Sequence, residues 1–279
     1  MQIGLADRHT EAQIAVRPQR ATASRREHMI RWLLPPITFA LFLLGWEALV
    51  RLGRYPAFIL PSPQRVGQKL IAVALDGTLW QHAGVTLVEV LGGLTLGATI
   101  AALLGYLLAQ SVAIERAISP YLVASQAIPI VAIAPLLVIW FGPGLVSKIL
   151  ISALIVFFPI LVNTIAGVRS VPPDLRDLMR SLHATRWQML VKLEIPAAMP
   201  VLLAGLKVGA TLSVIGAVVG ELAGADAGLG FMINLADGQY DTARVFVGVL
   251  ALVVMALSLY GIVSLLEWHL LRWRKAGGG

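Results

Sequence analysis

Long apolar runs recur along the chain and constrain its fold more than any other feature. Short polar segments separate six such runs, each of about 20 residues or more. The hydrocarbon core of a bilayer is about 30 Å thick, and a helix of about 20 residues crosses it. We therefore predict an all-α polytopic membrane protein with about six transmembrane helices. The expected spans are approximately residues 32–50, 84–110, 118–141, 146–169, 197–222 and 245–271.

The composition supports this class. Hydrophobic residues make up 58% of the chain and charged residues 13%, whereas soluble domains have about 25% charged residues. The chain has no cysteine, so disulfides, cysteine-ligated metals and thiol chemistry are excluded. A net charge of +7 can indicate nucleic-acid binding. In a membrane protein a positive net charge more often reflects the excess of Lys and Arg in cytoplasmic segments, so no nucleic-acid partner is expected.

The distribution of lysine and arginine predicts the orientation. If the N-terminus is cytoplasmic, 16 of the 22 Lys and Arg residues lie on the cytoplasmic side and six lie outside. Cytoplasmic segments carry such an excess, which predicts cytoplasmic N- and C-termini. Residues 1–30 are expected to form a flexible tail, 31–272 the transmembrane domain, and 273–279 a C-terminal tail.

Two connectors on the outer side have distinct patterns. Residues 54–77 contain three prolines and then a short amphipathic stretch, expected to lie along the outer interface. Residues 224–244 are rich in Gly and Asp around an apolar island. This pattern predicts a partly re-entrant or interfacial turn.

The connector at residues 172–196 carries large apolar side chains on a segment that should face water. Pro172 and Pro173 end the fourth span, and Asp174 is a suitable N-cap for a short helix. The apolar residues that follow have the i, i+3, i+4, i+7 spacing of one helical face. They are Leu175, Leu178, Met179 and Leu182.

A second short helix is predicted after a break at His183–Ala184. Thr185 and Gln188 have capping-box spacing. Trp187 leads a second apolar face, and Pro196 is expected to end the loop. Two interpretations follow: amphipathic helices that lie on lipid, or an exposed apolar face that docks in a groove of a soluble partner.

The same connector resembles the EAA loop of inner-membrane permeases of ABC importers. That loop has an E-A-A triplet, then a glycine, then a closing apolar-Pro element. Asp177, Leu178 and Met179 stand at the triplet, His183 at the glycine, and Ile195–Pro196 near the closing element. The resemblance implies a coupling loop that binds an ATPase, with Asp177, Leu178, Met179, Leu182, His183, Ala184, Trp187 and Pro196 as its residues.

Three further segments resemble one branch of this family. They are "FILPSPQRV" (58–66), "VFFPILVNTIAGV" (156–168) and "LSVIGAVVGELAGADAGLGFMI" (212–233). The branch imports nitrate, sulfonates, taurine, and pyrimidine or flavin vitamin precursors. The resemblance covers about residues 30–272.

This loop departs from the family pattern at the triplet, where Asp177, Leu178 and Met179 stand for E-A-A, and at the bend, where His183 stands for glycine. We expect these changes to affect the geometry of the loop. Glycine at the bend would permit a positive φ, and histidine is among the residues enriched at such angles. His183 is therefore expected to preserve the bend with some strain or tilt. No second His or Cys lies near it in sequence, which argues against a metal or acid–base role.

No nucleotide-binding or hydrolase motif is present. The chain has no G-x-x-x-x-G-K-[ST], H-E-x-x-H or G-x-S-x-G. We expect no catalytic residues, no metal and no cofactor, and we expect ATP hydrolysis in a separate subunit.

Polar residues inside the spans require partners or a function. Gln126, Asn163 and Ser213 are candidates for lining a pathway, although each is equally suited to hydrogen bonding between helices. Glu221 is expected at the outer gate. Glu89 lies in the first two turns of its span, and for this residue the alternative to a functional role is a pairing with another helix end. Glycine pairs at 93/97, 205/209 and 216/220 favour close helix packing.

These features predict the permease subunit of an ATP-driven importer that works by alternating access. The resemblance implies a location in a bacterial inner membrane, with two ATPase subunits, a second and identical permease copy and an extracytoplasmic binding protein as partners. The apolar spans imply contact with membrane lipid. The scarcity of central cations, together with the branch resemblance, favours a pyrimidine (thiamine-precursor) or riboflavin-type solute over nitrate, sulfonate or taurine. The alternatives are an ion-coupled secondary transporter and a non-transport membrane scaffold.

Overall fold

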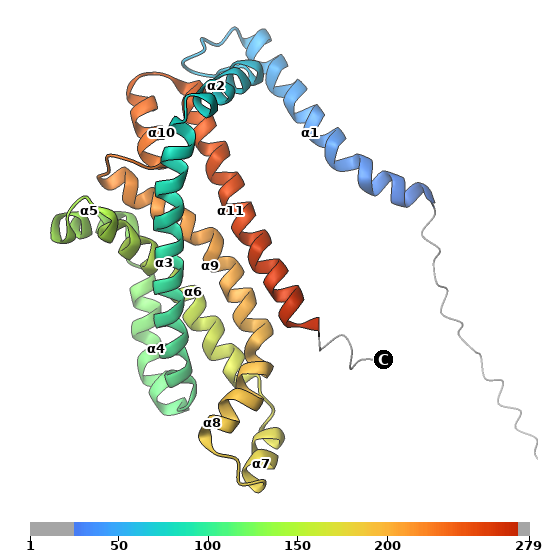
Figure 1. Cartoon of the computed structure of the whole chain (residues 1–279), viewed down its shortest axis with the longest axis vertical. Coiled ribbons are helices and arrows are strands. Elements are labelled where there is room, and N and C mark those ends of the chain that lie inside the picture. The colour runs from blue at the N-terminus through green and yellow to red at the C-terminus, as the bar shows by residue number, and fades with distance from the viewer. Residues whose placement is uncertain (1–24, 273–279) are drawn as a thin grey trace, which may run out of the picture. The chain divides into compact units, whose positions relative to one another are not determined.

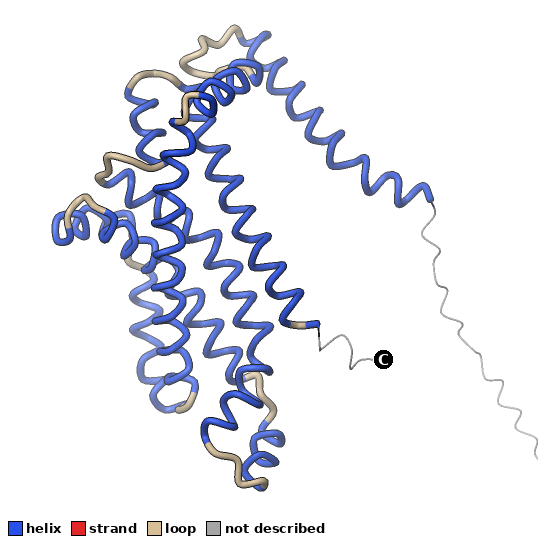
Figure 2. Tube along the Cα trace, viewed as in Figure 1, coloured by secondary structure: helices blue, strands red, loops and turns tan. Residues whose placement is uncertain are grey.

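The protein is built from helices joined by short loops (Figures 1 and 2). The computed structural model describes residues 25–272, and this part of the chain contains no strand. The predicted all-α fold is confirmed. The tails expected at 1–30 and 273–279 lie outside the described residues, except that the first helix begins at Arg25. The chain divides into two units, residues 1–52 and 53–279.

The first unit is dominated by helix α1 (Arg25–Gly53). Its segment Leu33–Gly53 is long and apolar enough to cross a membrane. Glu47 accepts a hydrogen bond from Arg51 Nε at 2.6 Å, one turn further along the same helix. The Glu47 charge is therefore paired within its own helix near the end of the span.

Three long helices form the core of the second unit. They are α3 (Thr78–Ala109), α6 (Leu145–Arg169) and α9 (Ile195–Ala223), and α11 (Thr242–Leu270) packs against α9. All four are long and apolar enough to span a bilayer. They account for four of the six spans predicted from the apolar runs.

Glycines let the core helices approach closely. A Cβ added to Gly97 of α3 would lie 2.6 Å from the carbonyl oxygen of Ala153 on α6. A Cβ on Gly216 of α9 would lie 2.5 Å from Cα of Ser152 on α6. No side chain fits at such distances, so the close packing predicted for the glycine pairs is confirmed at these two members.

The third predicted span is not one continuous helix. Residues 118–141 fall on α4 (Val112–Gln126) and α5 (Ile130–Phe141), which meet at 87°. Pro129 lies at the break. Proline has no N–H to donate and disfavours helical backbone at the residue before it, which explains why the helix stops there. The described part of the chain thus has five single-helix spans, or six if the bent pair is one span.

Two short helices lie at the end of the bundle where α3 and α11 begin (Figure 1). Helix α2 (Pro63–Leu75) is capped by Ser62, and α10 (Leu229–Gly238) packs against α3, α9 and α11. Between α2 and α3, the amide of Thr78 donates to Asp76 Oδ1 at 2.9 Å, and this hydrogen bond lowers the pKa of Asp76. The helices of the 172–196 connector lie at the opposite end of the bundle.

Candidate coupling loop and buried polar groups

Helix α7 (Pro173–Ser181) begins the loop between α6 and α9. Pro172 is its N-cap residue, so the prediction that Asp174 caps this helix is wrong. Proline is well suited to the first helical position, which Pro173 occupies. Asp174 instead lies in the first turn, where a negative charge favours the helix N-terminus.

The predicted apolar face of α7 is largely exposed. Leu178 is 55% exposed and Leu182 is 68% exposed, while Met179 is half-buried. Asp177 pairs with Arg180 at 3.1 Å, and both side chains are about 70% exposed. An ion pair this exposed contributes little to stability, so Asp177 is accessible to a partner.

The bend after α7 is set by the backbone of His183. Its φ is +55°, in the left-handed region that was expected for the position of the family glycine. The His183 amide donates to the Arg180 carbonyl at 2.9 Å, and the Ala184 amide donates to the Met179 carbonyl at 3.0 Å. These two hydrogen bonds form a Schellman motif, whose left-handed residue is usually glycine. Histidine thus adopts the left-handed conformation that glycine usually supplies in this motif.

Helix α8 (Arg186–Met189) follows with the predicted capping box. The Gln188 amide donates to Thr185 Oγ1 at 3.2 Å, and the Thr185 amide donates to Gln188 Oε1 at 2.9 Å. Trp187 is 71% exposed. The second half of the loop therefore also presents a large apolar side chain to solvent.

Helical structure continues through Pro196, the residue that was predicted to end the loop. Residues Arg186–Ala223 form one helical run, in which the π-helical turn η1 (Leu190–Glu194) leads directly into α9. Pro196 lies in the first turn of α9. It cannot donate to a preceding carbonyl, and the wider η1 turn accommodates this change in hydrogen bonding.

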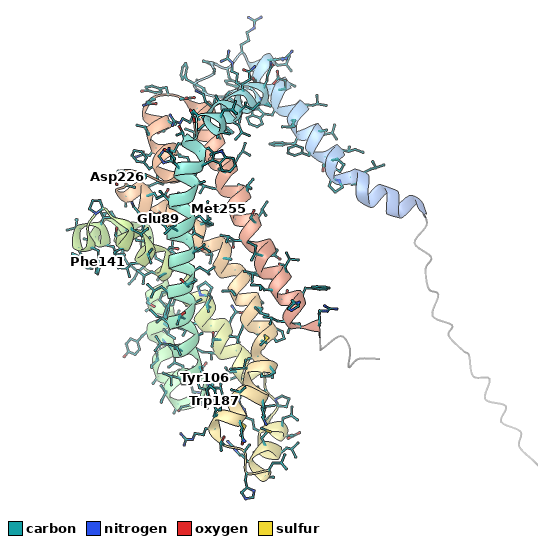
Figure 3. All side chains as sticks on the ribbon, in the orientation of Figure 1. Glu89, Tyr106, Phe141, Trp187, Asp226 and Met255 are labelled. Carbon is teal, nitrogen blue, oxygen red and sulfur yellow. The ribbon has the colours of Figure 1, made fainter. Side chains whose placement is uncertain are left out.

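A buried carboxylate joins the loop to the membrane helices, and the sequence analysis did not identify it. Glu194 is 5% exposed and accepts a hydrogen bond from the Tyr106 hydroxyl of α3 at 3.1 Å. Arg176 Nη2 of α7 lies 3.6 Å from Glu194 Oε1 and donates to the Val168 carbonyl of α6 at 2.7 Å. Figure 3 labels Tyr106 and Trp187 at this end of the bundle. The available signal was an acidic residue directly before Ile195–Pro196.

The structure places the pathway candidates in different surroundings. Gln126 is exposed at the end of α4, and Asn163 is half-buried, with its amide donating to the Pro159 carbonyl at 2.8 Å. Ser213 is fully buried, and its carbonyl accepts a hydrogen bond from Ser152 of α6 at 3.0 Å. Ser213 thus joins two helices, whereas Gln126 is accessible.

Glu221 holds the start of α10 against α3. It is 2% exposed and accepts hydrogen bonds from the Thr86 hydroxyl at 2.6 Å and from the Gly230 amide. Thr86 in turn accepts from the Leu229 amide at 2.8 Å, and His82 Nδ1 accepts from the Gly228 amide at 3.0 Å. The N-terminus of α10 is a favourable site for a carboxylate because its amides point toward the charge.

A buried ion pair lies beside this network. Glu89 of α3 is 0% exposed and Lys148, in the first turn of α6, is 4% exposed. Lys148 Nζ lies 3.6 Å from Glu89 Oε1, so Glu89 pairs with another helix end, the alternative noted above. Glu221 is also a charged neighbour of Glu89. The pair lies in the half of the bundle that is farther from the loop (Figure 3 labels Glu89).

Comparison with known proteins identifies the family. Residues 84–272 match the model of the binding-protein-dependent transport system inner membrane component. The chain belongs to this family. It is 48% identical over 241 residues to the riboflavin transport system permease protein RibX of Chloroflexus aurantiacus, covering 86% of this chain and 90% of RibX.

Two further relatives carry other substrate names. The formylaminopyrimidine transport permease protein ThiX of Halalkalibacterium halodurans is 35% identical, over 87% of this chain and 96% of ThiX. The taurine transport system permease protein TauC of Escherichia coli is 32% identical, over 85% of this chain and 88% of TauC. A crystal structure of an amino acid ABC transporter shares the fold, with a TM-score of 0.51 and 21% identity over 72% of this chain and 95% of that one.

The protein is therefore an inner-membrane permease component of an ABC importer. It is a multi-pass membrane protein and not an enzyme, since ATP hydrolysis in this family resides in separate subunits. Family membership implies ATPase and substrate-binding partners. It favours this function over the ion-coupled transporter and the membrane scaffold.

Proposed function

We propose that two copies of this chain form the translocation path of an importer, that each binds one cytosolic ATPase subunit through the 172–196 loop, and that a binding protein delivers substrate from outside. The observation that carries this proposal is the exposed apolar face of the loop, formed by Leu178, Leu182 and Trp187. Contiguous exposed apolar surface marks a site of protein interaction. The chain termini are proposed to be cytoplasmic, which places this face in the cytosol.

The proposed mechanism uses the loop as a lever. Because α8, η1 and α9 form one helical run, a force on Trp187 acts directly on the core helix α9. Glu194 connects the same run to α3 through Tyr106 and to α7 through Arg176. Closure of the ATPases would thus move a connected set of core helices and switch the path between inward- and outward-open states.

The roles proposed for the polar residues differ between the two ends of the bundle. Gln126 and Asn163 are the proposed pathway residues, since neither is fully buried within one copy. Ser213 is proposed to join α6 and α9. Glu221 is proposed to act at the outer gate by holding α10.

The docking role is tested by Leu182→Asp and Trp187→Asp. A carboxylate in a desolvated interface costs several kcal/mol, so we expect loss of ATPase co-purification with normal membrane insertion. Leu182→Met is the matched control, because it keeps an apolar side chain of similar volume. If both aspartate variants retain the ATPase as well as the control does, the loop helices lie on lipid instead.

The proposed substrate is a small heteroaromatic vitamin precursor of the riboflavin or pyrimidine type. RibX and ThiX, named for such compounds, are 48% and 35% identical to this chain. Nitrate, sulfonate or taurine is the less favoured class, because TauC is 32% identical and because the buried Lys148 is already paired with Glu89.

A further inference from the structure

A cavity separates the end of α3 from the 172–196 loop. It has a volume of about 700 Å³. Tyr106 of α3 and Gln110, the C-cap residue of that helix, line one side. The loop contributes Glu194 and three arginines, Arg176, Arg180 and Arg186. Three guanidinium groups therefore face one carboxylate in its wall, and the excess charge is positive.

The single carboxylate is already engaged. Glu194 accepts from Tyr106 and pairs with Arg176. Arg176 still has a buried Nε that finds no hydrogen-bond acceptor. Donors left unsatisfied in a buried position are costly unless a ligand or water accepts from them.

The other two arginines are available to a ligand. The Arg186 side chain makes no hydrogen bond or ion pair to any residue between 25 and 272. Within the described part of the chain, the Arg180 side chain pairs only with Asp177, and both side chains of that pair are about 70% exposed. Guanidinium groups bind phosphate oxygens in bidentate fashion, so the free donors suit a phosphate-bearing anion.

The surroundings indicate where that phosphate comes from. Leu107 lines the cavity, and Leu103 precedes it by one turn on the same face of α3. Each is 62% exposed. An apolar strip therefore leads from the arginines along a membrane-spanning helix, as an acyl chain attached to the phosphate would require. The inner leaflet of a membrane supplies anionic lipids at this level.

We propose that the arginine cavity binds the phosphate of an anionic phospholipid headgroup, with the acyl chains along Leu103 and Leu107. A lipid held there contacts both α3 and the coupling loop. This inference rests on the proposed cytoplasmic placement of the loop, but not on ATPase docking.

The test uses the full chain without the ATPase, so that failure of loop docking cannot affect it. The thermal unfolding midpoint is measured in detergent while phosphatidylglycerol or phosphatidylcholine is added, and retained lipid is counted by native mass spectrometry. We expect phosphatidylglycerol to raise the midpoint and phosphatidylcholine to have little effect. Equal shifts with both lipids would overturn the proposal.

Charge-neutralising variants locate the site. Arg180→Gln/Arg186→Gln should raise the half-saturating concentration of phosphatidylglycerol about tenfold or more, because hydrogen bonds to a charged group are lost. Arg116→Gln is the control, since Arg116 is exposed on α4 and does not line the cavity. Arg180→Lys/Arg186→Lys keeps the charge and should retain part of the response. An unchanged response in the glutamine variant refutes the site.

Inorganic phosphate distinguishes a lipid from a soluble ligand. We expect phosphate alone to give no comparable shift at millimolar concentration, because it lacks the apolar contacts. If phosphate reproduces the shift and displaces phosphatidylglycerol, the occupant is a soluble anion and the lipid assignment is wrong.

Discussion

The backbone of His183 is strained at the bend between α7 and α8. His183 has a φ of +55° at the position of a Schellman motif where glycine is usual. Left-handed backbone costs a residue with a Cβ about 1–2 kcal/mol. Part of this free energy is therefore lost at His183, where the left-handed backbone forms the bend between α7 and α8.

His183→Gly should therefore retain transport and raise stability by up to about 1 kcal/mol. His183→Val should lower stability and transport, because a β-branched side chain is poorly tolerated at positive φ. Thermal unfolding and substrate-stimulated ATPase activity of the complex measure the two effects. A functional valine variant beside an inactive glycine variant would show that the imidazole itself has a role.

The buried ion pair between Lys148 and Glu89 allows a prediction about the stability of the protein. Lys148 faces Glu89 at 3.6 Å, and Glu221 is close. Breaking a buried ion pair costs about 3–5 kcal/mol when one charge remains. Lys148→Met and Glu89→Gln should each destabilise the protein, because each leaves one member of the buried pair without its partner.

Glu89→Gln/Lys148→Met should recover part of the loss, since it removes both members of the pair. Thermal unfolding of the four proteins in detergent gives the comparison. Equal stability of all four would mean that the pair contributes nothing, and additive losses in the double variant would mean that the two side chains do not interact.

At the scale of elements, close helix contact holds the core together. Gly97 of α3 faces the backbone of Ala153 on α6, with no room for a Cβ. In a lipid bilayer no hydrophobic force drives helices together, so van der Waals contact at close approach supplies the attraction instead. The same principle explains why α3, α6 and α9 form the core.

Gly97→Ala should destabilise the protein by about 1–3 kcal/mol, since overpacking forces α3 and α6 apart. Gly84→Ala is the matched control, because Gly84 lies in the same helix with nothing within 4 Å of the added Cβ. It should be neutral or stabilising by up to about 1 kcal/mol through helix propensity. Equal midpoints for the two variants would argue against tight packing of α3 on α6.

At the scale of the whole molecule, the function depends on an assembly. The second permease copy, the ATPases and the binding protein are proposed partners of this chain. The exposed helices α4 and α5, of which only Ala134 and Leu137 are buried, are then available to line the path or contact the second copy.

The substrate class is tested on that assembly. With its own binding protein present, the reconstituted complex should show ATPase stimulation by riboflavin or a hydroxymethylpyrimidine compound. Taurine, alkanesulfonate and nitrate are the matched comparisons. Stimulation by one of these anions alone would reverse the substrate assignment and leave the family unchanged.

The sequence by itself determined the features that depend on local pattern. Hydropathy located the spans, and residue spacing located α7, α8 and the Thr185–Gln188 capping box. These features form from residues within a few positions of each other, so the local sequence pattern is sufficient to predict them. The break at Pro129 was also a local signal, but the apolar run across it masked the change in direction.

Only the tertiary structure decided which distant residues meet. Glu194 lies 88 positions from Tyr106, and Glu221 lies 135 positions from Thr86. Both pairings depend on how α3 crosses α9, and that crossing is set by side-chain volumes at the interface rather than by the period of any one helix. A carboxylate in an apolar segment needs a hydrogen-bond or ion-pair partner, but only the packing of the helices determines which residue that partner is.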